Sequence, residues 1–312
     1  MGQKFLISKL SSLGDVVCSL PAAAALKRGF PDCAVTWVVD PRFADVVECC
    51  SAVDEVVRAK PGFSPKAWPK LDGPFDAALD LQGLSKSAIV VARAKAELKV
   101  GYHRQREGAW LFSERVLPDP SSQHIVDQYV DVARAVGGVA NEAEFALAPK
   151  PADLDSVREK LKARGVDGPF AVLNPGAGWV SKRWPAEHCA SLVALLADQG
   201  LATVLIGGRA EKERSVVAEV VALCSRPAVD LAGETSVGEL IALVSLCAVH
   251  VGGDTGSSHI AGALGRPAAG LFSGTRPERY CPYGQIQRCL HEPGGLAAIS
   301  PERVAAVVAS AL

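Results

Sequence analysis

Apolar and polar positions along the first half of the chain follow two alternating patterns. Short apolar runs have the length and composition of buried strands: KFLIS, AVTWVVD, DEVVRA, FDAALDLQ and LKVGY. Between these runs, longer segments with apolar residues three or four positions apart predict helices at residues 15–28, 42–50, 84–94 and 125–136. Strands that alternate with helices in this way are typical of a parallel sheet with crossover helices.

The alternation stops once and then resumes. A polar, proline-bearing segment, LAPKPADLD at residues 147–155, is followed by a second set of strand-like runs: FAVLNPG, ATVLIGG, AVDLAG, AVHVGGD and AAGLFSG. We therefore predict two α/β domains, residues 1–150 and 151–312, with a ligand cleft between them. The final segment, SPERVAAVVASAL, predicts a helix that Ser300 caps, with Pro301 at its first position.

Composition narrows the classes of protein. A chain of 312 residues with 49% apolar residues can form two ordinary cores. Lys and Arg total 33 against 34 acids, which argues against nucleic acid as the main partner because phosphate-backbone binding normally requires a basic surplus. The nine cysteines include no CxxC pair, so we expect neither a zinc site nor disulfides. Free cysteines fit a reducing compartment, so we expect a cytoplasmic protein. We expect neither secretion nor a membrane span, with peripheral membrane contact left open.

The strongest local motif is AVHVGGDTGSSHIAGALGRP, at residues 248–267. A buried strand ends in two glycines, and a helix is expected to begin near His259, after five further turn residues: Asp254, Thr255, Gly256, Ser257 and Ser258. Glycines admit a ligand to the backbone and a helix N-terminus favours anions, so this turn suits a diphosphate. An ordinary capped turn is the alternative, and His259 is equally compatible with packing. Neither G-x-G-x-x-G nor a P-loop is present, which argues against a dehydrogenase or an NTPase.

Two more turns follow strands of the second half. NPGAGWVSKRWP includes Gly176, Ala177 and Lys182; the lysine could neutralise a leaving phosphate, or it could be an ordinary surface cation. LIGGRAEKERS offers Glu211 and Glu213 in a first helical turn. These carboxylates are either simple helix-dipole partners or ligands for a ribose diol.

The first half contributes an acid and a basic region. SSLGDVVCSLP begins a helix after the first strand with a single glycine and then Asp15, most simply a helix-terminal carboxylate. DLQGLSKSA follows another strand. Residues 58–106 contain ten Lys or Arg residues and only four acids. This basic region is either a solvated face or a surface for an anionic substrate or membrane.

Asp153 and Asp155 form the sequence D-x-D, which binds metals in some sugar transferases, but we treat this match as chance. Because the sequence has no cluster of metal-type ligands, we expect no metal and no cofactor.

Four motifs in this order, SKLSSLGDVVCSLPA, DLQGLSKSA, NPGAG…SKRWP and GGDTGSSHIAGALGRP, make the chain resemble the ADP-heptose:lipopolysaccharide heptosyltransferases of glycosyltransferase family 9. The resemblance implies a GT-B fold, with two Rossmann-like, doubly wound parallel-sheet domains facing a central cleft. The first domain would bind the acceptor and the second the nucleotide sugar. It also implies metal-independent, inverting transfer onto the inner core of lipopolysaccharide.

The resemblance assigns roles to residues. The catalytic base falls on Asp15, and a lysine near the donor phosphate on Lys182. Other donor-binding positions would be Gly176, Ala177, Asp254, Thr255, Gly256 and His259, with Glu211 or Glu213 on the ribose. Ser257 and Ser258 fill positions where relatives often have a bulkier apolar residue. The acceptor would contact Ser12, Gly14, Gln82, Gly83, Lys86 and Arg106. The family's acceptor-phosphate contacts are only loosely matched, by Arg58, Lys60, Lys66 and Lys70.

The resemblance also implies partners and leaves alternatives. The donor would be ADP-heptose and the acceptor a precursor of the Kdo-lipid A type, with peripheral contact at the cytoplasmic face of the inner membrane. We expect a monomer. Two alternatives stay open: a GT-B enzyme of another nucleotide sugar, either a transferase or an epimerase, and a non-catalytic sugar-nucleotide binding protein.

Overall fold

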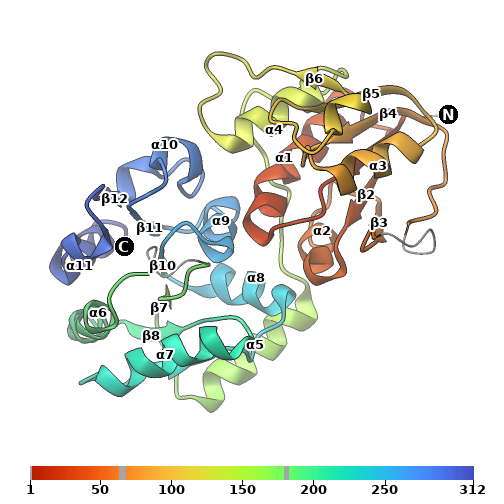
Figure 1. Cartoon of the computed structure of the whole chain (residues 1–312). Helices are drawn as coiled ribbons and strands as arrows, with labels where there is room; N and C mark the ends of the chain where they lie inside the picture. The colour runs from red at the N-terminus through yellow and green to blue at the C-terminus, as the bar shows by residue number, and fades with distance from the viewer. Residues whose placement is uncertain (1, 63–67, 179–182) are drawn as a thin grey trace. The chain divides into compact units, whose positions relative to one another are not determined.

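The computed structural model describes residues 2–62, 68–178 and 183–312. The chain forms two compact units, Met1–Ala148 and Pro149–Leu312, which are described separately below and can be followed by colour in Figure 1.

The first unit is a six-stranded parallel sheet with helices on both faces. Its strands have the order β3-β2-β1-β4-β5-β6. They are β1 Lys4–Ser8, β2 Ala34–Val39, β3 Glu55–Arg58, β4 Phe75–Asp80, β5 Ala96–Tyr102 and β6 Glu114–Val116. The helices are α1 Leu13–Gly29, η1 Pro41–Phe43, α2 Ala44–Glu48, α3 Ser85–Arg93, η3 Ala109–Leu111 and α4 Ile125–Arg134.

Burial explains why these strands are continuous apolar runs. Because helices cover a parallel sheet on both faces, strand residues of either face must be apolar. On one face, Leu6, Val38 and Ala78 pack with Val90 and Val91 of α3 in one buried cluster. On the other face, α1 packs against α4. Truncating a fully buried leucine such as Leu6 to alanine typically costs about 2–5 kcal/mol.

The second unit repeats this design. Its sheet is also parallel, with the order β12-β11-β10-β7-β8-β9. The strands are β7 Phe170–Asn174, β8 Ala202–Leu205, β9 Val229–Asp230, β10 Val249–Gly252, β11 Ala268–Phe272 and β12 Cys289–His291. The helices are α5 Pro151–Ala163, α6 Ala186–Asp198, α7 Glu211–Leu223, α8 Val237–Leu246, α9 Gly256–Ala263, α10 Pro277–Tyr280, η5 Ile286–Arg288, η6 Leu296–Ala298 and α11 Pro301–Ala309. Helices α6, α7 and α11 share one buried cluster with the sheet.

Counted within each unit, the strand order is the same, 3-2-1-4-5-6. The order reverses between the first and fourth strands, where Ser8 pairs with Asp80 in one unit and Asn174 with Gly252 in the other. Open α/β sheets bind ligands at the carboxyl ends of the strands at this switch point. The Rossmann-like, doubly wound fold predicted for each half is confirmed.

The structure adds to the predicted elements and corrects one boundary. All ten predicted strands are present, and α11 begins at Pro301 with Ser300 as its cap, accepting from the Arg303 N–H at 3.3 Å. The strands β6 and β12, of three residues each, were not predicted, because ERV and CLH are too short to show a periodicity. Helix α9 begins at Gly256, not near His259.

None of the helices in the described part of the chain has the length and hydropathy of a membrane-spanning segment.

Candidate functional site

Asp15 lies in the first turn of α1, directly beyond the carboxyl end of β1. Ser12 donates to Asp15 Oδ2 twice, from its backbone N at 3.3 Å and from its hydroxyl at 2.7 Å. The Asp15 side chain is 46% exposed. One oxygen of the carboxylate is therefore anchored to the start of the helix, while much of the group is accessible to a ligand.

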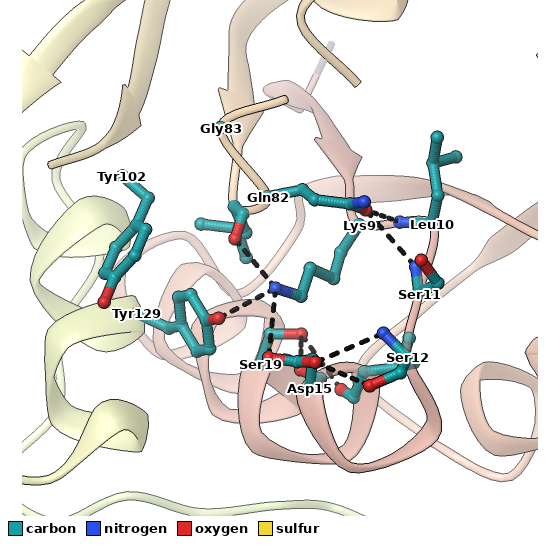
Figure 2. Close-up of polar contacts among 12 residues, drawn as sticks. Lys9, Leu10, Ser11, Ser12, Asp15, Ser19, Gln82, Gly83, Tyr102 and Tyr129 are labelled. Carbon is teal, nitrogen blue, oxygen red and sulfur yellow. Dashed lines mark hydrogen bonds and ion pairs between the residues drawn. The ribbon is translucent and has the colours of Figure 1, made fainter. Parts of the chain in front are cut away.

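Lys9 lies beside this carboxylate and was not recognised from the sequence (Figure 2). Its Nζ is 3.7 Å from Asp15 Oδ1, and its side chain is only 4% exposed. The ammonium donates to the Leu81 carbonyl at 3.1 Å and to the Tyr129 hydroxyl at 2.7 Å. Burial lowers the pKa of Lys9 below its ordinary value, and the charges of Asp15 and Asp80 oppose that shift. The site thus pairs an accessible anion with a buried cation.

Gln82 connects the ends of β1 and β4. Its Oε1 accepts from the backbone N of Leu10 at 2.8 Å and of Ser11 at 3.2 Å. Asp80 in turn fixes the turn that contains Gln82, since its Oδ1 accepts from the backbone N of Gln82 at 3.0 Å and of Gly83 at 2.8 Å. Asp80 is fully buried, and burial raises its pKa. The turn after β4 is therefore hydrogen-bonded through the Gln82 side chain to the backbone that follows β1.

Gly83 brings a third loop to this place. It adopts a φ of 70°, and a Cβ there would lie 2.9 Å from the Arg104 carbonyl oxygen, so a side chain is excluded. The Gly83 carbonyl accepts from the Arg106 backbone N at 2.8 Å. Lys86, in the first turn of α3, and Arg106 both have exposed side chains. The predicted acceptor-binding residues thus lie on the loops that follow β1, β4 and β5 (Ser12, Gln82, Gly83 and Arg106) and in the first turns of α1 and α3 (Gly14 and Lys86).

In the second unit, the turn after β10 forms the N-terminus of α9. Thr255 is the residue before the helix, and Gly256 is its first residue. Ser257 and Ser258 therefore belong to the first helical turn, although the sequence suggested a loop there. The His259 Nε2 lies 3.4 Å from Asp254 Oδ1. The backbone N–H groups at a helix N-terminus and the positive end of the helix dipole favour anions, as predicted for this turn.

Asn174 joins this turn to the one after β7. Its side-chain Oδ1 accepts from the Gly176 backbone N at 3.0 Å. Its Nδ2 donates to the Ser257 hydroxyl at 2.9 Å and lies 3.3 Å from the Thr255 hydroxyl. Asn174 is a second residue that sequence reasoning missed, although its position at the end of a strand in a glycine-rich motif could have indicated it. Ala177 follows in the same turn, and Lys182 lies outside the described residues, as does Lys66 of the first unit.

The two candidate ribose ligands differ in environment. Glu213 Oε2 accepts from the Gly208 backbone N at 2.8 Å, so this carboxylate folds back onto the turn after β8. Glu211 is exposed at the first position of α7. Both carboxylates remain candidates.

Within the described residues, no group of three or more His, Cys, Asp or Glu side chains is arranged to hold a metal ion. Asp153 and Asp155 both lie on α5.

Two Rossmann-like units in one chain, with a glycine-containing turn at a helix N-terminus in the second and an accessible carboxylate in the first, are the features of a GT-B glycosyltransferase. The chain belongs to glycosyltransferase family 9, because the model of that family, described as glycosyltransferase family 9 (heptosyltransferase), matches residues 66–298. The resemblance inferred from the four motifs is therefore confirmed, and the protein is a glycosyltransferase.

Individual relatives agree with this assignment. The lipopolysaccharide core heptosyltransferase OpsX of Haemophilus influenzae is 27% identical over 293 residues, 90% of this chain and 82% of that protein. Lipopolysaccharide heptosyltransferase 1 of Escherichia coli K12 is 29% identical over 313 residues, 93% of this chain and 94% of that protein. The solved structure of E. coli heptosyltransferase WaaC with ADP is 26% identical and superposes with a TM-score of 0.79, covering 99% of this chain and 100% of that one.

Proposed function

We propose that this protein transfers a heptose from ADP-heptose to the inner core of a lipopolysaccharide precursor of the Kdo-lipid A type, with inversion and without a metal. The names of the two curated relatives and the ADP in the WaaC structure support this choice of acceptor and nucleotide. The observation that most supports the chemistry is the accessible Asp15 carboxylate, anchored by Ser12 beside the buried Lys9 ammonium.

Asp15 acts as the general base in this proposal. It takes the proton of an acceptor hydroxyl while that oxygen forms a bond to the anomeric carbon. The bond from that carbon to the diphosphate breaks on the opposite side, and its electron pair leaves on ADP. General base catalysis of this kind contributes about 10²- to 10⁴-fold. Lys9 does not contact the substrate; its ammonium, 3.7 Å from Asp15 Oδ1, holds the carboxylate in place by attraction of opposite charges.

The turn before α9 binds the donor diphosphate. The helix N-terminus at Gly256, the Thr255 hydroxyl and Lys182 would stabilise the negative charge that develops on the leaving ADP. Gly176 and Ala177 allow the backbone to approach the donor, Asp254 and His259 contact the transferred sugar, and Glu211 or Glu213 binds the ribose diol.

The acceptor binds to the loops at the switch point of the first unit. Ser12, Gly14, Gln82 and Gly83 line the approach to Asp15, and the exposed cations Lys86 and Arg106 favour an anionic acceptor. Because the acceptor is a lipid, we propose that the protein acts at the cytoplasmic face of the inner membrane. We also propose that it acts as a monomer.

A surface of the first unit supports peripheral membrane contact. Trp110, Leu111 and Phe112 are consecutive, and their side chains are 55%, 73% and 40% exposed. Large exposed apolar residues in a run are unusual on a soluble surface and mark interaction sites. Exposed Arg106 and Arg115 flank this run in sequence, so it combines apolar insertion with attraction to anionic lipid headgroups.

The donor assignment is tested by a thermal-shift panel of ADP, UDP, GDP and CMP. A ligand that binds only the folded protein raises its melting temperature according to its affinity. We expect ADP to give the largest shift, and a preference for UDP would overturn the ADP-heptose assignment.

A further inference from the structure

His250 is a fully buried polar residue that the proposed reaction does not use. It lies within β10, and its side chain is 0% exposed. The imidazole packs against Gly252, where a Cβ would be only 3.0 Å from His250 Cε1. Its Nε2 lies 3.0 Å from the Ser257 hydroxyl, in the first turn of α9. A polar ring buried directly below an anion-binding turn requires a physical account.

The hydrogen bonds around Ser257 determine where the histidine proton lies. Asn174 Nδ2 can only donate to the Ser257 hydroxyl, since the Oδ1 of the same amide accepts from the Gly176 backbone N. The Nδ1 of His250 is buried and has no hydrogen-bond partner among the described residues. A buried N–H without an acceptor is rarer than a buried acceptor without a donor. The proton is therefore on Nε2, and His250 donates to Ser257.

This assignment fixes the direction of the next bond. Ser257 already accepts from His250 and from Asn174, so its own proton goes to the Thr255 oxygen, 3.1 Å away. Thr255 then accepts from Ser257 and lies within reach of Asn174 Nδ2 at 3.3 Å. A hydroxyl that accepts twice has only its proton left to offer.

Ser258 completes the arrangement. Its hydroxyl donates to the Gly253 carbonyl at 2.6 Å, so it can only accept from Thr255, 3.2 Å away. The Thr255 proton can thus be given to Ser258 or to an anion bound at the N-terminus of α9. Diphosphate oxygens at neutral pH are acceptors, which matches a hydroxyl that is set as a donor.

We propose that His250 is a positioning residue that, through Ser257, orients the Thr255 hydroxyl as a donor to the diphosphate of the bound nucleotide. The inference rests on the proposed function only in taking a nucleoside diphosphate as the ligand of this turn. Burial lowers the pKa of His250 to about 3, with a smaller contribution from His259, so the ring is neutral under ordinary conditions and its role is to direct a hydrogen bond.

The test measures ADP and UDP affinity by isothermal titration calorimetry. His250→Met removes the donor at similar volume, whereas His250→Gln keeps an N–H donor on a side chain of similar reach. Since a neutral hydrogen bond contributes modestly, we expect His250→Met to weaken nucleotide binding about three- to tenfold and His250→Gln to stay within about twofold of wild type. Val249→Ala, a buried substitution on the same strand, controls for a general loss of stability.

Ser257→Ala removes the link and provides a second variant if His250→Met does not fold. We expect the same loss as for His250→Met and no further loss in the double variant, because both substitutions break one chain. If wild type binds ADP and both single variants bind it equally well, the inference is wrong and the proposed function stands. If wild type binds UDP and not ADP, with the same dependence on His250, the donor assignment is wrong and the inference stands. If wild type binds neither nucleotide, both are wrong.

Discussion

The Lys9 ammonium lies 3.7 Å from the Asp15 carboxylate, yet the lysine side chain is 4% exposed and the aspartate 46%. The ammonium donates to the Leu81 carbonyl and to the Tyr129 hydroxyl, and these hydrogen bonds hold it in its buried position. If both side chains were exposed, an ion pair at this distance would contribute little to stability. A fixed, buried cation instead gives the carboxylate a preferred position and a favourable electrostatic environment.

Lys9→Met is therefore expected to lower kcat, because Asp15 loses its fixed neighbour. The KM for the donor should change little, because we propose that the donor binds to the second unit. We expect a loss of about tenfold, less than the ~10²- to 10⁴-fold that loss of the general base itself would cost, because Asp15 is still present. Steady-state kinetics at several donor concentrations provides the measurement.

Tyr129→Phe is the matched control for this change, since it removes one partner of Lys9 and keeps the charge. It should have a smaller effect than Lys9→Met, with melting temperatures confirming that both variants are folded. An unchanged kcat in Lys9→Met would show that the buried cation does not position the base.

The buried His250 predicts a pH dependence of stability. In the unfolded chain an imidazole binds a proton below its ordinary pKa of about 6.5, whereas burial keeps the pKa of His250 at about 3 in the folded protein. Between these values the unfolded state binds more protons, so the free energy of unfolding falls as the pH falls. The slope from one such group is at most about 1.4 kcal/mol per pH unit.

Urea denaturation of wild type and His250→Gln at pH 7.0, 5.5 and 4.5 isolates this contribution. The difference between the two proteins should change in favour of the variant as the pH is lowered below about 6.5. Parallel curves over this range would contradict the assignment of His250 as a buried neutral group.

The exposed run at residues 110–112 predicts binding to anionic vesicles. Replacing Trp110, Leu111 and Phe112 together by serine should lower co-sedimentation with phosphatidylglycerol-containing vesicles several-fold. The reason is that the variant loses the apolar side-chain area that would insert among the lipid headgroups. Kinetics with a soluble, delipidated acceptor should not change.

Val221 and Leu223 on α7 provide a matched control, since they are also exposed apolar residues, at 37% and 47%. Their replacement by serine should leave vesicle binding intact. Equal binding by the triple variant and wild type would remove this surface from the account.

Much of the fold was predictable because burial on both faces of a parallel sheet requires continuous apolar runs, such as AVTWVV and FDAALD. The turns after these strands were also predictable as turns, since glycines and hydroxyl residues cluster where strands end, and their role as sites stays a prediction. The order of the strands was not, because periodicity reports which residues are buried and not which strands are neighbours. The short edge strand β12 has too few residues for a pattern.

The residues that sequence reasoning missed depend on distant partners. Lys9 interrupts an apolar run, and its burial becomes intelligible only with Tyr129, which is 120 positions away. His250 similarly lies in a strand-like pattern, and its role depends on Asn174 from another strand by way of Ser257. The early start of α9 has a related cause. Serines favour caps and turns locally, but the Ser257 hydroxyl here is bound by His250 and Asn174 from two strands, which is compatible with the helix.

The central claim is that Asp15 is the base of a heptosyl transfer, and Asp15→Asn tests it most directly. The amide keeps the size of the side chain and can still accept from the Ser12 hydroxyl, but it cannot take a proton. With ADP-heptose and a purified Kdo-lipid A acceptor, the account predicts that ADP release falls by about 10²- to 10⁴-fold while ADP affinity is retained. Turnover near the wild-type rate in Asp15→Asn would contradict it.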